Sequence, residues 1–215
     1  MSQSLSALYG LMPPPPVPVK RQVFVSSFHA DRREVDTFIY RWAITEKVFT
    51  ANALATFDND DFINSTNPEY VMSQIRSKYL MDSSVTILLV GKCTHSRRYV
   101  DWELKSSLRQ GTNVPNGLLA FVLPSAMPPD HGLLGPIPWT QRAWPSIPDR
   151  LAANWNYFQP DNCYARYYIM PTSADELRQH IEAVVTNRTS RAHLIQNDAT
   201  MMKYNARCRV CGVTH

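Results

Sequence analysis

The chain has 215 residues, of which 44% are hydrophobic and 19% are charged, and its formal net charge is +4. This composition is typical of one globular domain, and the mild charge without a Lys/Arg block does not indicate a nucleic-acid partner. No apolar run reaches the roughly 20 residues of a membrane span, and the start of the chain lacks the pattern of a secretory signal, so we expect a cytoplasmic protein without a membrane partner.

Residues 1–20 contain the run PPPPVPVK. Such a run favours extended polyproline II structure and offers few donors for regular hydrogen bonding. We therefore expect a Pro-rich N-terminal tail or spacer here, and recognition by a proline-binding module is the alternative. The folded domain is expected to occupy residues 21–187.

The first predicted strand is Gln22–Phe28, whose sequence is QVFVSSF. A helix is then expected to start near Asp31, because Glu34 follows three residues later in the spacing of a capping box. Apolar residues follow at i, i+3, i+4 and i+7, which indicates an amphipathic helix, and they are Val35, Phe38, Ile39 and Trp42. Strand, short turn and helix in this order form a βα unit.

The second strand is expected within Val48–Phe57, although the stretch TANALA could equally be helical. Asp58–Asn67 is a polar loop with three acidic residues. It lacks the Gly and the distal Glu of an EF-hand, so we expect a solvated loop rather than a cation site. Asn67 is placed to cap a helix that starts at Pro68, and the apolar face of this helix comprises Val71, Ile75 and Tyr79.

Val85–Val90 is a short, unbroken apolar run rich in β-branched residues. This pattern is typical of a strand buried on both faces at the centre of a parallel sheet. Gly91 ends the run and Lys92–His95 forms a polar turn. Ser96 can then serve as the N-cap of a helix that extends to about Gln110.

Within this helix, the residues predicted to face the sheet recur every four positions, at Val100, Leu104 and Leu108. Asp101 can pair with Lys105 on the outer face. Glu103 lies at the flank of the apolar stripe and has no partner at i+4. A glutamate in the first turns is favoured by the helix dipole alone, so its function has to be argued from further observations.

The remaining strands are expected at Gly117–Leu123 and Tyr164–Met170, and the last helix at Ser173–Thr186. Between them, residues 124–160 are rich in proline and tryptophan and show no clear period. We expect an irregular excursion that covers the site and is packed down by aromatic side chains, namely Trp139, Trp144 and Trp155. Residues 188–215 have no periodic pattern and are expected to form a C-terminal extension.

The four cysteines do not form a disulfide framework, which agrees with a reducing cytoplasm. Cys208, Cys211 and His215 have the spacing of half a zinc site. A fourth ligand such as Cys163 or His193 cannot be placed from the sequence, and Cys93 is interpreted as a small buried residue. We therefore expect no metal site, and the role of the C-terminal cysteines is left open.

Alternating strands and helices predict an α/β fold: a flavodoxin-like, five-stranded parallel sheet of order 2-1-3-4-5 with helices on both faces. Its ligand crevice lies at the carboxyl ends of strands 1 and 3, between Ser26–Asp31 and Lys92–Ser96. A phosphoacceptor domain is disfavoured because the third strand ends in Gly-Lys rather than Asp. A nucleotide phosphate loop is disfavoured because SSFHAD contains no glycine.

Two stretches carry a family resemblance: FVSSFHAD at residues 24–31 and SVTILLVGKCTHSRRYVDWEL at residues 84–104. Together they resemble the TIR-like proteins of the Thoeris antiphage system, of the ThsB type, and more distantly TIR domains at large. In those proteins an aromatic residue precedes the catalytic glutamate by four positions, and Tyr99 and Glu103 hold this spacing. The resemblance covers roughly residues 22–125.

The resemblance implies a TIR-like domain that breaks the nicotinamide–ribose bond of NAD and makes a cyclic or conjugated ADP-ribose signal for a separate effector protein. NAD is then the substrate and no cofactor is required. Glu103 is expected to be catalytic, and the expected substrate-binding residues are Ser26, Ser27, Phe28, His29, Thr94 and Tyr99. A homo-oligomer is a further expected assembly. The alternative is a non-catalytic TIR scaffold that acts by self-association or adaptor contacts.

Overall fold

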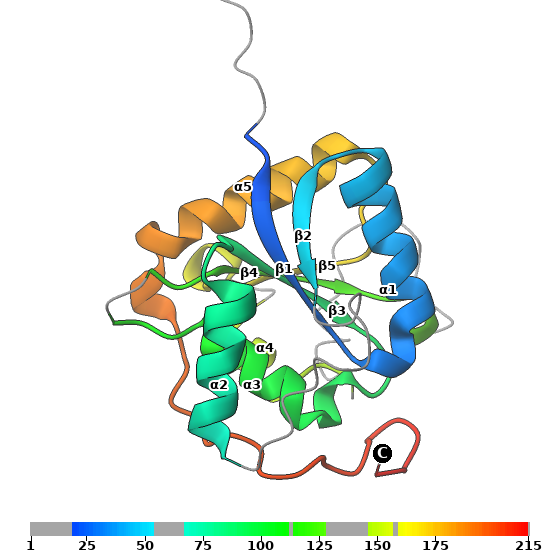
Figure 1. The fold of residues 1–215 in the computed structure, drawn as a ribbon, viewed down its shortest axis with the longest axis vertical. Helices are drawn as coiled ribbons and strands as arrows, with labels where there is room; N and C mark the ends of the chain where they lie inside the picture. The colour runs from blue at the N-terminus through cyan, green and yellow to red at the C-terminus, as the bar shows by residue number, and fades with distance from the viewer. Residues whose placement is uncertain (1–18, 54–66, 112–113, 128–145, 157–158, 215) are drawn as a thin grey trace, which may run out of the picture.

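The core of the molecule is a five-stranded sheet in which all neighbouring strands are parallel and the order is β2-β1-β3-β4-β5 (Figure 1). The computed structural model describes residues 19–53, 67–111, 114–127, 146–156 and 159–214. The strands are β1 Arg21–Ser27, β2 Phe49–Ala53, β3 Val85–Val90, β4 Gly117–Val122 and β5 Arg166–Tyr168. The predicted flavodoxin-like order is confirmed.

The central position of β3 is also confirmed. Val85 pairs with Val23 of β1 on one side and with Gly117 of β4 on the other. All six residues of β3 are buried, as expected for a strand covered on both faces. At the edge of the sheet, β5 has only three residues and is shorter than the predicted Tyr164–Met170.

One face of the sheet is covered by α1 (Arg32–Ile39) and α5 (Ala174–Ser190). Helix α1 continues into a π-helical segment, Tyr40–Thr45. The predicted apolar face is buried against the sheet, and it comprises Val35, Phe38, Ile39 and Trp42. Helix α5 starts at the predicted place, where Ser173 caps it and the Ser173 hydroxyl accepts a hydrogen bond from the backbone N–H of Glu176 at 3.2 Å. The helix extends beyond the predicted end, Thr186, to Ser190.

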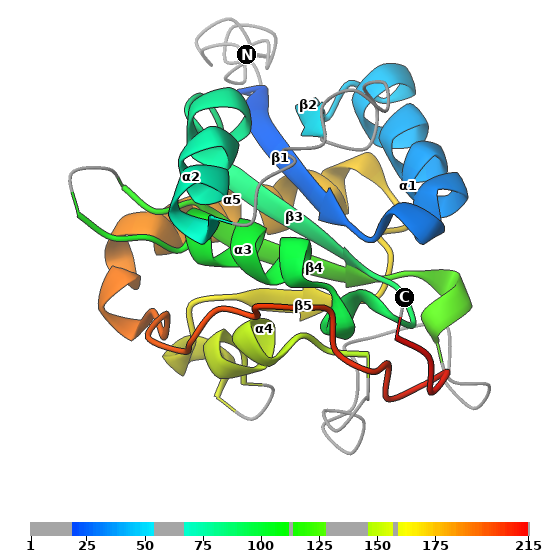
Figure 2. The same cartoon turned by 60° about the horizontal axis from the view of Figure 1, so that its bottom comes forward.

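The opposite face is covered by α2 (Pro68–Ile75), α3 (Arg98–Ser107) and α4 (Asp149–Asn154) (Figures 1 and 2). Asn67 caps α2 as predicted, since its side-chain oxygen accepts from the backbone N–H of Tyr70 at 3.3 Å. The predicted inner face of α3 packs on the sheet, and it comprises Val100, Leu104 and Leu108. No helix within the described ranges has the length and apolar character needed to cross a membrane.

Two predictions about α3 are wrong. Arg97, not Ser96, is the residue that precedes the helix, because the Ser96 hydroxyl donates to the carbonyl of Cys93 at 2.8 Å within the preceding turn. Asp101 pairs with Arg150 at 2.9 Å instead of with Lys105. The reason is that Arg150 belongs to α4, which reaches the side of α3 that the sequence pattern assigns to solvent.

Part of the predicted excursion at residues 124–160 is described. Trp155 is buried in the core beside β5, and its ring meets that of Tyr167 edge-on with centroids 5.2 Å apart. Helix α4 was not predicted, because six residues are too few for a periodic pattern. Trp139 and Trp144, most of the N-terminal tail and most of the acidic loop lie outside the described residues.

The C-terminal extension is docked on the domain rather than trailing from it as a tail. After α5 the chain runs along α3 and ends beside the loop that follows β3 (Figure 2). The indole N–H of Trp102 donates to the carbonyl of Met202 at 2.8 Å, and the backbone N–H of Ala206 donates to the carbonyl of Ser96 at 2.9 Å. Such contacts with backbone groups leave no periodic pattern in the sequence.

Candidate functional site

The candidate site lies where β1 and β3 end side by side. Ser26 and Ser27 are in register with Leu88 and Leu89 of β3. The next residues of each strand enter short loops that contain the helical turns His29–Asp31 and Thr94–Ser96, and the second loop leads into α3. Because β1 has β2 on one side and β3 on the other, this edge is the topological switch point expected for a ligand site.

The structure joins two of the sequence-predicted residues at this edge. The hydroxyl of Ser26 donates a hydrogen bond to Oε2 of Glu103 at 2.5 Å. Ser26 is 1% exposed and Glu103 is 7% exposed, so the pair is buried between the end of β1 and α3. Helical geometry places Glu103 at the flank of the stripe facing the sheet, and the close approach of β1 to α3 removes that flank from solvent.

Burial changes the acidity of this carboxyl group. Loss of hydration raises the pKa of Glu103 from its ordinary value to about 8, and the hydrogen bond from Ser26 lowers it only in part. At neutral pH the carboxyl group of Glu103 is therefore protonated in most molecules. A cation placed beside the group favours the ionised form and returns the pKa toward its usual range.

Phe28, His29 and Arg97 form a second group of contacts at the same edge. The guanidinium carbon of Arg97 lies 4.3 Å from the ring centre of Phe28, and the ring of His29 meets that of Phe28 edge-on at 4.5 Å. Phe28 and Arg97 are buried, whereas His29 is exposed. Sequence reasoning did not select Arg97, because an Arg-Arg pair after a polar turn has the pattern of a solvated surface.

Asp31 and Gly91 are packed against each other across this edge. A Cβ atom at position 91 would lie 1.9 Å from Oδ2 of Asp31, so only glycine fits the observed arrangement. Burial and the neighbouring Glu34 raise the pKa of Asp31 to about 6, and Arg97 opposes the shift. Oδ2 of Asp31 is buried and has no hydrogen-bond partner among the described residues. Gly91 thus has a packing role beyond ending β3.

The other predicted site residues differ in how far their side chains are exposed to solvent. Thr94 is fully buried, and its hydroxyl accepts from the backbone N–H of Gly91 at 2.8 Å, which closes the turn after β3. Tyr99 is half-buried, with its ring edge-on to Trp102 at 5.5 Å, beside the cluster under α2. Ser27 is half-buried at the end of β1. Thr94 therefore shapes the turn, while Ser27 and Tyr99 keep some accessible surface.

Comparison with known protein families relates the middle of the chain to one of them. Residues 24–122 match the family described as "Thoeris protein ThsB, TIR-like domain". The matched part begins in β1, ends with β4 and contains both Ser26 and Glu103. Among curated proteins, none matches the chain. The family resemblance that the two sequence stretches indicated is thereby confirmed, and α4, β5, α5 and the C-terminal segment lie beyond the match.

Proposed function

Residues 24–122 form a TIR-like domain of the Thoeris ThsB type, that of an antiphage-defence protein, and from this premise we propose that the protein is an enzyme that consumes NAD. It cleaves the bond between nicotinamide and ribose and forms a cyclic or conjugated ADP-ribose signal. The observation that carries the proposal is the buried Ser26–Glu103 pair at the switch point of the sheet. NAD serves as substrate, and no resident cofactor is involved.

The proposed chemistry requires a negative charge beside the reacting ribose. Nicotinamide leaves as a neutral molecule from a pyridinium, and the ribose carbon passes through a cationic, oxocarbenium-like state. A carboxylate in a site of low dielectric stabilises this cation far better than one in water. Glu103 supplies the carboxylate, and the hydroxyl of Ser26 holds one of its oxygens in place.

The protonated resting state of Glu103 fits this mechanism. The pyridinium of NAD is a cation, and a cation beside Glu103 lowers the pKa of its carboxyl group. Substrate binding therefore promotes release of the proton, and the anionic carboxylate forms where the ribosyl cation develops. Without a cation beside it, the buried group stays largely neutral at pH 7, which avoids the cost of an unpaired buried charge.

Substrate contacts are proposed at the loop after β1 and at the start of α3. The residues with accessible surface are Ser27, His29 and Tyr99. Phe28 and Thr94 are buried and act by holding these loops in position. When water is excluded from such a site, a hydroxyl or a base nitrogen of the substrate can attack the ribosyl cation, which yields a cyclic product. A separate effector protein is proposed to bind this product.

A non-catalytic scaffold is the second candidate function. It is favoured by the burial of Glu103, because a carboxyl group that is 7% exposed and hydrogen-bonded to Ser26 already has a structural role. Such a protein would act by self-association or adaptor contacts through its TIR-like domain. The two functions differ in one measurable property, which is NAD consumption.

The experiment is incubation of the purified full chain with NAD, alone and with lysate of phage-infected cells, followed by mass spectrometry of the nucleotides. We expect release of nicotinamide together with a cyclic or conjugated ADP-ribose species. The lysate is included because a phage component is a reasonable trigger, and lysate without the protein is the control. NAD that stays intact under both conditions would favour the scaffold.

A further inference from the structure

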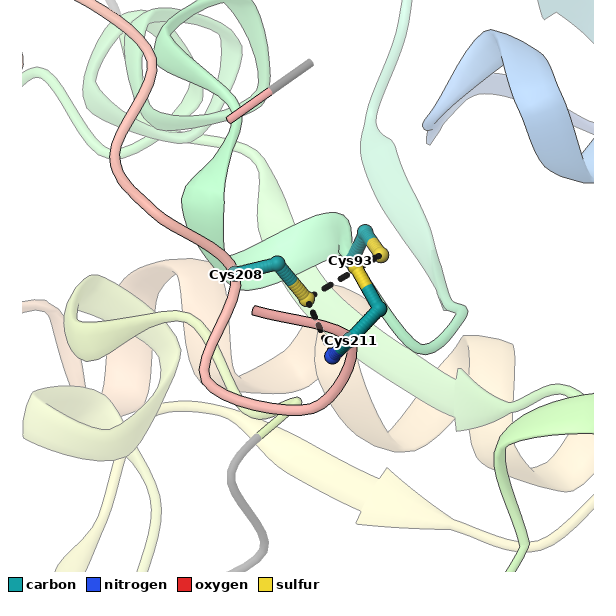
Figure 3. A group of neighbouring side chains, drawn as sticks. All are labelled: Cys93, Cys208 and Cys211. Atoms are coloured by element: carbon teal, nitrogen blue, oxygen red, sulfur yellow. Dashed lines mark hydrogen bonds between the residues drawn. The ribbon is translucent and has the colours of Figure 1, made fainter. Parts of the chain in front are cut away.

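Three cysteine side chains from distant parts of the sequence meet beside the loop that follows β3 (Figure 3). Cys93 belongs to this loop, and Cys208 and Cys211 belong to a turn of the C-terminal segment. The sulfur of Cys93 lies 3.1 Å from that of Cys208 and 3.4 Å from that of Cys211. All three sulfur atoms lie within 4.8 Å of one another.

Local structure holds the C-terminal pair in a tight turn. The backbone N–H of Cys211 donates to the sulfur of Cys208 at 3.4 Å, and the backbone N–H of Gly212 donates to the carbonyl of Cys208 at 2.9 Å. Gly212 has a φ of 74°, a conformation that glycine adopts without strain. A backbone N–H directed at a cysteine sulfur stabilises its thiolate form, which is the form that binds metals.

The turn is also fixed to the loop that carries Cys93. The backbone N–H of Arg209 donates to Nε2 of His95 at 2.9 Å, and the Cys208 thiol donates to the carbonyl of Lys92 at 3.6 Å. Cys93 and Cys208 are buried together with Phe28. These contacts do not depend on a bound ion, so the three sulfur atoms are already gathered on a folded scaffold.

Tetrahedral zinc chemistry fits this arrangement. A Zn–S bond of about 2.3 Å places two thiolates of a tetrahedral site about 3.8 Å apart, close to the observed separations. All four cysteines lie in the described part of the chain, and none forms a disulfide. Three thiols cannot all pair with one another as disulfides, whereas three is a usual number of cysteine ligands in a structural zinc site.

We propose that Cys93, Cys208 and Cys211 bind a zinc ion that fastens the C-terminal segment to the loop following β3. Each thiol releases its proton to solvent as its sulfur donates an electron pair to the metal. The described residues thus supply three of the four ligands of a tetrahedral site. Of the further ligands considered from the sequence, Cys163 faces the carbonyls of Asn156 and Ala165, His193 is exposed, and His215 lies outside the described residues.

The zinc site has a structural role and is independent of the proposed NAD chemistry. It joins two segments that are more than a hundred residues apart, as the separation of 115 positions between Cys93 and Cys208 shows. The sequence indicated only half of this site. Cys93 was not selected as a ligand because no other cysteine or histidine stands near it at the spacing of a zinc site. Folding of the chain brings its sulfur to those of Cys208 and Cys211.

The test uses the full chain purified under reducing conditions without chelators. We expect about one zinc per chain by elemental analysis, and in the cobalt-substituted protein an intense thiolate-to-cobalt charge-transfer band. Cys93→Ser, Cys208→Ser and Cys211→Ser should each lower the bound zinc at least about tenfold. Cys163→Ser is the matched control and should keep the full zinc content, because this buried thiol lies away from the cluster.

Folding is checked separately by circular dichroism. Cys211 is exposed, so Cys211→Ser is expected to fold even where substitution of a buried cysteine does not. The proposal is overturned if the parent chain binds neither zinc nor cobalt through sulfur, or if folded Cys211→Ser retains zinc with unchanged affinity. It is also overturned if peptide mapping of the freshly purified protein shows a disulfide among the three residues.

Discussion

The hydroxyl of Ser26 donates a hydrogen bond to the carboxyl group of Glu103 at 2.5 Å, between residues 77 positions apart in the sequence. This contact connects the end of β1 with α3 and buries both side chains. The hydrogen bond fixes the position of Glu103 at the switch point of the sheet. Burial raises the pKa of its carboxyl group to about 8, and the hydrogen bond from Ser26 opposes that shift only in part. The first predictions follow from this pair.

Glu103→Gln should abolish NAD turnover while the protein stays folded. Glutamine keeps the shape and accepts the hydrogen bond from Ser26, but it lacks the negative charge that the ribosyl cation requires. We expect a loss of more than about a hundredfold in kcat, or about 3 kcal/mol in the barrier. The matched control is Glu182→Gln, because Glu182 is exposed on α5 and pairs with Arg21. Full activity in folded Glu103→Gln would end the catalytic role of this residue.

The pH dependence of the reaction should report the same group. Since the pKa of Glu103 is about 8, the fraction of protein with an ionised carboxylate rises as the pH approaches 8. We expect kcat/KM for NAD to increase with pH up to that value and then level off, because kcat/KM follows the ionisation of the free enzyme. Initial rates measured across the range check this. A flat profile between neutral and mildly alkaline pH would contradict a catalytic carboxylate with a raised pKa.

Stability should depend on pH in the opposite direction. The folded protein keeps the Glu103 proton up to about pH 8, whereas the unfolded chain releases it near the ordinary value of 4.5. Stability from this group is therefore full below the lower value, and it falls by up to about 1.4 kcal/mol per pH unit between the two. Glu103→Gln removes the dependence. Urea unfolding of both proteins should show the variant gaining relative stability from pH 5 toward 8, and a constant difference would refute the linkage.

Gly91→Ala should destabilise the edge that contains the candidate site. The new methyl group would lie 1.9 Å from Oδ2 of Asp31, so the two loops must separate. We expect a loss of about 1–3 kcal/mol in the free energy of unfolding, as for other overpacked sites. Thermal unfolding measures the loss. If the clash is the cause, adding Asp31→Ala to the variant should recover part of the stability, and no recovery would point to another cause.

Arg150→Ala should loosen the C-terminal segment. Arg150 has a side chain that is 1% exposed, pairs with Asp101 at 2.9 Å and donates to the carbonyls of Asn197 and Ala199. Removal of one partner leaves a buried charge, for which a cost of about 3–5 kcal/mol is typical. Hydrogen exchange should rise in residues 195–206. Arg178→Ala, which removes an exposed pair with Asp175, is the control and should cost less than about 1 kcal/mol.

The parts of the fold that sequence predicted well are those with strong local patterns. The apolar run Val85–Val90 matches β3 residue for residue, and the i, i+3, i+4, i+7 pattern beginning at Val35 gives the buried face of α1. The switch-point rule then placed the loops after β1 and β3 at one edge. The hydrogen bond between Ser26 and Glu103 joins the end of β1 to the middle of α3, and this pairing was not itself predicted.

The parts that sequence missed depend on contacts between distant residues. Asp101 has a suitable partner at Lys105 by helical spacing, yet it binds Arg150 from a six-residue helix that shows no periodic pattern. The C-terminal segment is held through backbone carbonyls such as that of Met202, and any sequence supplies these. The sequence pattern around Arg97 indicates a solvated surface residue, whereas in the structure its guanidinium group packs against the ring of Phe28. In each case the residue that makes the contact is too far away in the sequence for a local pattern to predict it.

The docking of the C-terminal segment along α3 also has a consequence for the order of folding during synthesis. The ribosome releases the five strands and α3 before residues 195–214 emerge. During that time Trp102 and Asp101 lack the backbone groups of Met202 that they bind in the folded protein. Until that segment emerges, the helix that bears Glu103 lacks the contacts that the segment makes with it in the folded protein. A segment made about a hundred residues later thus completes the surroundings of α3.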